Sequence, residues 1–308
     1  MTNLVIPEGV KSIGRSAFSG CSSLTTITLP ESVTSIGDYA FWGCSSLTAI
    51  TIPESVTSIQ YCAFLGCSSL TTITLPEGVT SIGESAFRGC SSLTAITIPE
   101  SLTSIGFEAF DGCSSLTAIT IPEGVTSIGY DAFMGCSSLE RVTINCANVG
   151  DWFKGLSSIK ECVLGERVTS IGKEIFADCS NLKVLTLGKG LKKIAAEAFS
   201  TCEALEKITI HATQPPRIEG NGNALFSDAT YDNATLYVPQ GSISKYQVMT
   251  GWSGFYNIIG MESGIENMEL THQNSPLIYD LNGRRVATPT KGGIYIINGR
   301  KVVVKIGM

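Results

Sequence analysis

The sequence CSSLTTITLPESVTSIGDYAFWG (residues 21–43) is followed directly by CSSLTAITIPESVTSIQYCAFLG (residues 44–66), and related units continue on both sides. A cysteine opens each unit and recurs every 23 residues, at Cys21, Cys44, Cys67, Cys90, Cys113 and Cys136. A fixed period in this range is typical of a solenoid, in which a unit buries its apolar face only against its neighbours. The period therefore predicts a stack of rungs.

Within one unit the alternation of apolar and polar residues predicts short strands. Ile27 and Leu29 alternate with threonines, and Pro30 ends this first strand because it has no N–H group. A second extended segment covers 33–37, and residues 38–43 are expected to form a tight helical turn. The positions expected to face the core are Leu24, Ile27, Leu29, Val33, Ile36, Ala40, Phe41 and Cys44. The predicted fold is a leucine-rich-repeat solenoid, a right-handed superhelix of 23-residue rungs.

One rung is irregular. The spacing from Cys136 to Cys179 leaves it three residues short, and the sequence WFKGL (152–156) replaces the usual Ala-Phe-x-Gly-Cys. This alignment gives Leu156 the position that cysteine has in the other units, and Trp152 the position that alanine has in them. We expect the stack to bend at this rung.

The periodic pattern defines a solenoid over residues 1–210 and dissolves after it. Residues 211–262 are expected to form an irregular last rung and a C-terminal cap. In this cap Ser242 would be the N-cap of a short helix, and Trp252, Phe255 and Tyr256 would cover the open end. Residues 263–308 are expected to be a linker and a small β-module, because two Asn-Gly pairs lie between β-type runs. The chain begins inside a unit, so we expect a preceding part that carries a signal peptide.

Composition and charge exclude several classes of partner. Hydrophobic residues make up 43% of the chain, which is enough for a core, and no apolar run approaches the ~20 residues of a membrane helix. Residues 1–138 carry three basic and eleven acidic side chains, and the whole chain has a net charge of −6. An acidic surface repels nucleic acid and anionic lipid. We therefore expect neither nucleic-acid binding nor membrane insertion.

The unit VTSIGxxAFxGCSSLTxITIPES resembles the BspA-type leucine-rich repeat of bacterial surface proteins over about residues 1–210. The ordinary leucine-rich repeat has an asparagine where this chain has Ser32, Ser55 and Gly78. The tail IYDLNGRRVATPTKGGIYIINGRKVVVK (278–305) is similar to the C-terminal module of exported Bacteroidetes proteins, the type IX secretion sorting domain. The resemblance implies a cell-surface or secreted Bacteroidetes protein, and members of the family are associated with adhesion.

Cysteine, glutamate and threonine each recur at equivalent positions of successive units, here called columns. Each column can be interpreted either as part of the fold or as a functional site. The cysteines are expected to be buried, reduced thiols, with a Cys146–Cys162 disulfide as an alternative across the irregular rung. Zinc is not expected, since there is no C-x-x-C pair and only two histidines. The repeated glutamates are interpreted as solvated turn residues rather than Ca²⁺ ligands. The outward threonines fit β-propensity, and an ice-binding grid remains an alternative. We expect no cofactor and no catalysis.

The candidate binding residues lie in the predicted helical turn. Most positions barely change between rungs, but three positions in this turn vary freely and include large apolar residues. Exposed aromatic residues that lie together are typical of recognition surfaces. The candidates are Tyr39, Trp42, Tyr61, Leu65, Phe107, Tyr130 and Met134. The alternative is that unconstrained surface positions have drifted.

Two functional hypotheses follow. The first is a non-catalytic, adhesin-like binding protein, monomeric and extracellular, that recognises a protein or glycan on a host or bacterial surface. The second is a structural spacer without a ligand of its own. A binder needs Trp42, Tyr61, Phe107 and Tyr130 exposed and close together, whereas a spacer tolerates serine at these positions.

Overall fold

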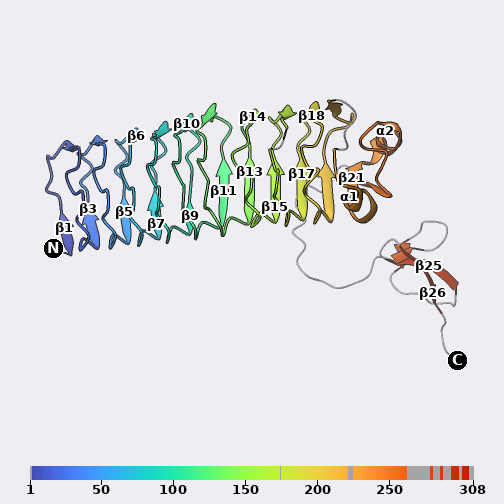
Figure 1. Cartoon of the computed structure of the whole chain (residues 1–308), viewed down its shortest axis with the longest axis horizontal. Coiled ribbons are helices and arrows are strands. Elements are labelled where there is room, and N and C mark those ends of the chain that lie inside the picture. Colours follow the sequence, from blue (N-terminus) through green and yellow to red (C-terminus); the bar gives the residue numbers. More distant parts are fainter. Residues whose placement is uncertain are drawn as a thin grey trace. The chain divides into compact units, whose positions relative to one another are not determined.

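The computed structural model describes residues 2–173, 175–220 and 225–261, the backbone alone of Asn148, and the backbone of four strands beyond residue 277. Two compact units divide the chain, Met1–Ser263 and Gly264–Met308. The first unit is the predicted solenoid of parallel strands, with about one rung for every 23 residues (Figure 1). The fold prediction is therefore confirmed.

Two rows of parallel strands run along the solenoid, and in both rows residues of successive rungs pair in register. The row of longer strands comprises β1 (Asn3–Val5), β3 (Thr26–Thr28), β5 (Ala49–Thr51), β7 (Thr72–Thr74), β9 (Ala95–Ile96), β11 (Ala118–Ile121), β13 (Arg141–Ile144), β15 (Glu161–Leu164), β17 (Val184–Leu187), β19 (Lys207–Ile210), β21 (Thr235–Pro239) and β22 (Asn257–Met261). The row of short strands comprises β2 (Ser12–Ile13), β4 (Ser35–Ile36), β6 (Ser58–Ile59), β8 (Ser81–Ile82), β10 (Ser104–Ile105), β12 (Ser127–Ile128), β14 (Asn148–Val149), β16 (Ser170–Ile171), β18 (Lys193–Ala195) and β20 (Arg217–Glu219).

The core repeats the same contacts in every rung. All eight positions predicted to face inward in the second rung are buried. The phenylalanine rings form a stack, and from Phe18 to Phe133 successive centroids lie 5.3–5.5 Å apart with nearly parallel planes. From Phe41 to Phe133 each ring is covered on both faces by neighbouring rings, so the rung that contributes it cannot bury it alone.

The third side of each rung, from the short strand to the cysteine, is not a helix. This segment, here called the arc (residues 37–43 in the second rung), is a run of overlapping turns, such as Trp42 N–H to Tyr39 O and Cys44 N–H to Phe41 O. The prediction of a helical turn is wrong in this detail. Two residues of the arc, Tyr39 (φ 56°) and Gly43 (φ 69°), have left-handed backbone, which interrupts a right-handed helix.

A cap closes the C-terminal end of the solenoid, at the orange end of Figure 1. It contains α1 (Asp228–Asn233), a 3-10 helix (Gln240–Ser242) and α2 (Ile243–Val248). Trp252 and Phe255 are buried and pack edge-on against Phe226, the last ring of the stack. Tyr256 does not cover the end as predicted, because its side chain is 90% exposed.

Ser242, the predicted N-cap of α2, lies where it was predicted but does not make the hydrogen bond of an N-cap side chain. Ser242 precedes the helix, but its hydroxyl donates to the carbonyl oxygen of Thr213 instead of accepting from the helix N-terminus. The side chain thus fixes the cap to the irregular last rung. The serine was recognised by its place in the sequence, whereas the competing carbonyl comes from a residue far away in the chain.

The second unit contains an antiparallel sheet of β23 (Ile278–Tyr279), β24 (Arg285–Val286), β25 (Gly293–Ile297) and β26 (Arg300–Val304). β23 pairs with β24 and β25 pairs with β26, the two strand pairs expected around the Asn-Gly sequences. The turn residues themselves and the predicted linker lie outside the described residues.

Candidate binding edge

The stacked arcs form one long side of the solenoid, here called the arc edge, and a ladder of backbone hydrogen bonds holds it together. In each regular step three N–H groups of one arc donate to carbonyls of the next, as in Cys62 to Glu84 (2.9 Å), Phe64 to Ala86 (2.8 Å) and Gly66 to Arg88 (2.7 Å). The left-handed residues make this possible, because they turn their N–H groups along the stack. The arc edge is therefore a rigid, hydrogen-bonded surface and not a set of loose loops.

The first aromatic group on this edge joins three neighbouring arcs. The ring of Tyr39 lies 5.1 Å from Tyr61 in an edge-to-face contact and 5.7 Å from Trp42, measured between centroids. The guanidinium of Arg15 lies 5.5 Å from the Tyr39 centroid, a cation–π distance. These four residues are here called the N-terminal aromatic cluster, and the contacts among its three rings and the guanidinium restrict their movement.

A charged group separates this cluster from the next exposed apolar residues. Arg88 pairs with Glu108 and with Asp111, the latter at 3.0 Å between Nε and Oδ2. Asp111 is buried, and burial raises the pKa of its carboxyl, an effect that the Arg88 charge opposes. The arginine thus stabilises two acidic side chains that would otherwise repel each other.

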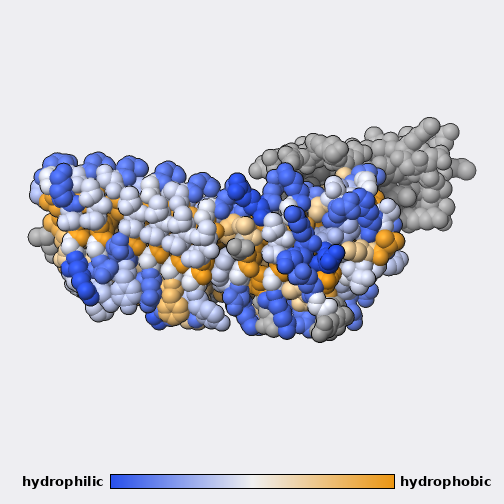
Figure 2. All heavy atoms as spheres, turned by 90° about the horizontal axis from the view of Figure 1, so that it is seen from above, coloured by the Kyte–Doolittle hydropathy of each residue, from blue (hydrophilic) through white to orange (hydrophobic). Residues whose placement is uncertain are grey.

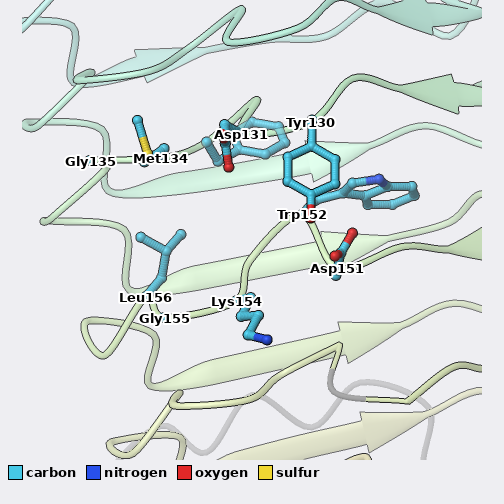
Figure 3. Close-up of a pocket in the computed structure, with 10 residues that line it drawn as sticks. Tyr130, Asp131, Met134, Gly135, Asp151, Trp152, Lys154, Gly155 and Leu156 are labelled. Atoms are coloured by element: carbon cyan, nitrogen blue, oxygen red, sulfur yellow. The ribbon is translucent and has the colours of Figure 1, made fainter.

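A second group of exposed apolar side chains lies in the two arcs that precede the shortened rung. Phe107 and Tyr130 are exposed, as is Met134. Tyr130 and Met134 line a pocket of about 260 Å³ together with Trp152 of the next arc (Figure 3). The arc edge therefore carries aromatic residues at two places, with charged residues between them.

The structure places the seven predicted residues unequally. Trp42, Tyr61, Phe107, Tyr130 and Met134 are exposed large apolar residues. Tyr39 and Leu65 are only half-buried, and Tyr39 is held between Arg15 and the two neighbouring rings. Its left-handed backbone aims the side chain along the edge.

Trp152 was missed as a candidate. The alignment put it in the column of buried alanines, yet it is half-buried and lines the pocket. Its arc has three residues between Val149 and Phe153 where the preceding arc has four between Ile128 and Phe133. Counting residues between the two aligned columns would have revealed that Trp152 has no alanine-like position to fill.

The cysteine column has a structural role. Except for exposed Cys21 the cysteines are buried, and none of the eleven, all of which lie in the described residues, is part of a disulfide, so Cys146 and Cys162 are not bridged. In the regular rungs the thiol donates to the phenylalanine carbonyl of the preceding rung, for example Cys136 Sγ to Phe110 O at 3.3 Å. Burial raises the pKa of the Cys136 thiol to about 12, so it keeps the proton that it donates. Leu156 fills the same column without a donor.

On the other surfaces of the solenoid, polar and charged side chains connect successive rungs. Threonines next to the long strands donate to the backbone of the preceding rung, as Thr71 does to Thr48 O. Figure 2 shows pale, weakly polar residues along much of the N-terminal half and more strongly hydrophilic ones towards the C-terminal half. There, cross-rung ion pairs such as Arg141–Glu161 (2.9 Å) join successive rungs.

The described residues lack a metal-binding cluster and a membrane-spanning helix. They contain no group of three or more His, Cys, Asp or Glu side chains placed to hold a metal ion. Among the same residues, no helix has the length and apolar character needed to cross a membrane.

The repeat and its arrangement define the class of protein. The BspA type leucine rich repeat region, a unit of six copies, matches residues 1–114, 34–152, 81–206 and 150–246. The chain belongs to this BspA type leucine rich repeat family. No curated protein matches the sequence.

Several solved structures match this chain. A leucine-rich repeat protein from Bacteroides ovatus is 23% identical, with 85% of this chain and 91% of that chain covered and a TM-score of 0.35. A leucine rich cell surface protein from Faecalibacterium prausnitzii is 24% identical, with 86% and 89% covered and a TM-score of 0.40. The leucine rich repeat protein of T. pallidum is 29% identical, with 66% and 77% covered and a TM-score of 0.39.

Proposed function

We propose that this protein is a non-catalytic, adhesin-like binding protein of the cell surface or extracellular space, and that it recognises a protein or glycan through the arc edge. The observation that carries the proposal is the N-terminal aromatic cluster, in which Trp42 is 48% and Tyr61 38% exposed although each has apolar neighbours. The extracellular location is part of the proposal and rests on the family.

The rigidity of the edge supports this proposal. Binding costs free energy for every side chain that must be ordered, about 0.5–1.5 kcal/mol for a flexible one. Tyr39 is already held by ring contacts with Trp42 and Tyr61, and its backbone is fixed by the ladder. Rings ordered before binding are suited to act as anchors, and aromatic residues dominate the energetics of protein interfaces.

The test is binding of the purified chain to an array of extracellular matrix proteins and glycans. A double variant, Trp42→Ser with Tyr61→Ser, should lose binding at least tenfold to the ligand that the native chain captures. The matched control is Val248→Ser with Tyr256→Ser, which removes two residues that are 81% and 90% exposed on the C-terminal cap. Circular dichroism verifies that both variants keep the fold.

The two variants separate the possible outcomes. Binding that the double variant loses and the control keeps supports the proposal. Equal binding by both variants contradicts recognition through the N-terminal aromatic cluster. An array without any captured ligand favours the spacer hypothesis, in which the exposed rings have no partner.

A further inference from the structure

The pocket at the shortened rung is built from two successive arcs. Its volume is about 260 Å³, and it lies between residues 130–135 and 151–156. Figure 3 shows the ring of Tyr130 and the indole of Trp152 at the same end of the pocket, near the carboxylate of Asp151. Trp152 lies against Gly150, where a Cβ atom would come within 2.5 Å of the indole nitrogen. The glycine thus creates the space that the indole occupies.

The missing arc residue interrupts the hydrogen-bond ladder at this pocket. In the step before it, Glu108 donates to Tyr130 O (3.0 Å), Phe110 to Ala132 O (2.8 Å) and Gly112 to Met134 O (2.8 Å). The equivalent donors of the next step are the N–H groups of Asp131, Phe133 and Gly135. Within the described residues, none of these three N–H groups has a hydrogen-bond acceptor in the protein.

The direction of these donors follows from the backbone. Asp131 has φ 54° and Gly135 has φ 71°, the same left-handed conformation as in the preceding arcs. Their N–H groups therefore point along the stack, towards the arc of Trp152 and into the pocket. A backbone donor without a protein acceptor requires water or a ligand. The shortened rung exchanges three internal hydrogen bonds for three donors that face a pocket.

We propose that this pocket binds one neutral sugar residue of a glycan. The three N–H groups can donate to hydroxyl oxygens, the carboxylates of Asp131 and Asp151 can accept from hydroxyl groups, and the faces of Tyr130 and Trp152 can pack on the C–H face of a sugar ring. The two carboxylates outnumber the one cationic side chain of the lining, that of Lys154, and so disfavour an anionic ligand. The volume lies below the roughly 300–1,000 Å³ of pockets for drug-sized ligands and therefore suits a single ring.

This inference names a ligand class for one end of the arc edge, so it rests on the proposed function while using other residues than the N-terminal aromatic cluster. The probes are printed neutral glycans and their sialylated counterparts, with the full chain as the binding protein. The native chain should bind a subset of neutral glycans and should bind the sialylated forms at least tenfold more weakly if the acid is on the recognised sugar.

Variants locate the binding. Trp152→Ala should reduce affinity for the bound neutral glycan at least tenfold, and Trp152→Phe should recover part of it. Asp151→Asn, at an exposed position, tests the carboxylate without removing a packed side chain and should also weaken binding. Gly150→Ala should displace the indole and resemble Trp152→Ala. The matched control, Val248→Ser with Tyr256→Ser on the C-terminal cap, should bind this glycan as the native chain does.

The inference is overturned if no neutral glycan binds, if only sialylated glycans bind, or if Trp152→Ala and Asp151→Asn bind as the native chain does. Failure of the proposed function has a different pattern. If Trp152→Ala loses a glycan while the Trp42→Ser and Tyr61→Ser double variant loses nothing, the pocket is a site and the N-terminal aromatic cluster is not. The reverse pattern leaves the proposed function standing without the sugar site.

Discussion

The thiol of Cys113 donates to the carbonyl oxygen of Phe87 in the preceding rung, 3.2 Å away. The same carbonyl accepts the N–H of Cys90 at 3.1 Å, so one acceptor serves two rungs. This contact recurs along the stack and explains why the column contains cysteine rather than alanine. A small apolar residue would fill the space, and only a thiol or hydroxyl adds the bond between rungs.

The first prediction concerns thiol accessibility. Ten of the eleven cysteines are buried, and Cys21 at the N-terminal rung is exposed. Ellman's reagent should therefore modify one thiol quickly in the native protein and the other ten only after unfolding in urea. Cys21→Ser removes the fast reaction. Several fast-reacting thiols in native protein would contradict the buried ladder.

The second prediction concerns alkaline pH. Burial raises the pKa of the Cys44 thiol to about 11 and those of Cys136 and Cys179 to about 12. From about pH 8.5 the unfolded chain loses thiol protons that the folded chain keeps, so the free energy of unfolding falls as pH rises. Each buried thiol contributes a slope of about 0.7 kcal/mol per pH unit at pH 8.5, which approaches about 1.4 kcal/mol per pH unit at higher pH until the pH reaches the folded pKa.

Urea unfolding at a series of pH values between 8 and 9.5 measures this slope. Cys136→Ala should reduce the slope by the contribution of one buried thiol. Cys21→Ser is the control, because it removes a thiol that is exposed and lies outside the core. A flat profile in the native protein would contradict the assignment of raised pKa values to the ladder.

The third prediction concerns the left-handed glycine of the arc. Gly89 has φ 70°, and a Cβ atom there would have room, with its nearest neighbour, Gly66 Cα, 3.7 Å away. Gly89→Val should therefore destabilise the protein through backbone strain, by about 1–2 kcal/mol. Gly89→Asn should cost less, because asparagine tolerates this conformation. Asp178, with φ 64°, occupies the same place in a later arc.

Urea unfolding of the two Gly89 variants measures the difference. The ranking native, asparagine, valine is the expected order of stability. Equal stability of the valine and asparagine variants would mean that the arc relaxes out of the left-handed conformation.

The fourth prediction contrasts a core ring with a surface ring. Phe87 is fully buried and stacked on both faces, so Phe87→Ala should cost about 3–5 kcal/mol. Trp42 is 48% exposed, and Trp42→Ser should cost about 1 kcal/mol at most, from its contact with Tyr39. Thermal unfolding compares the two. A large loss for Trp42→Ser would indicate that the ring serves the fold and not a partner.

The sequence was sufficient to predict most of the solenoid. Because the units are similar, each residue packs against the equivalent residue of the adjacent unit, and the repeat period identifies that residue. The inward positions, the strand positions and the strand pairs of the second unit follow from spacing alone. The arc was misjudged because helix and turn share the same apolar pattern. The signal was present in the second variable position, where Ser16, Tyr39, Cys62, Ser85, Glu108 and Asp131 all have left-handed backbone and none is β-branched.

The site was only partly predictable for another reason. Exposure at a variable position can be inferred from the repeat, and Trp42 and Tyr130 fulfil that expectation. Ring contacts between rungs depend on side-chain directions, so Tyr39 is more buried than its variability suggested. The pocket at Trp152 arises where the shortened rung lacks residues that the other rungs have. The prediction compared equivalent positions of successive rungs, and this comparison fails where a rung has no equivalent position.

The most direct test of the central claim is hydroxyl-radical footprinting of the chain with the ligand that it captures from the array. Trp42 and Tyr61 should be protected from oxidation in the complex, whereas Tyr256, which is 90% exposed on the cap, should be oxidised as in the free chain. Unchanged oxidation of Trp42 and Tyr61 in the saturated complex would contradict recognition through the N-terminal aromatic cluster and would place the partner on another face.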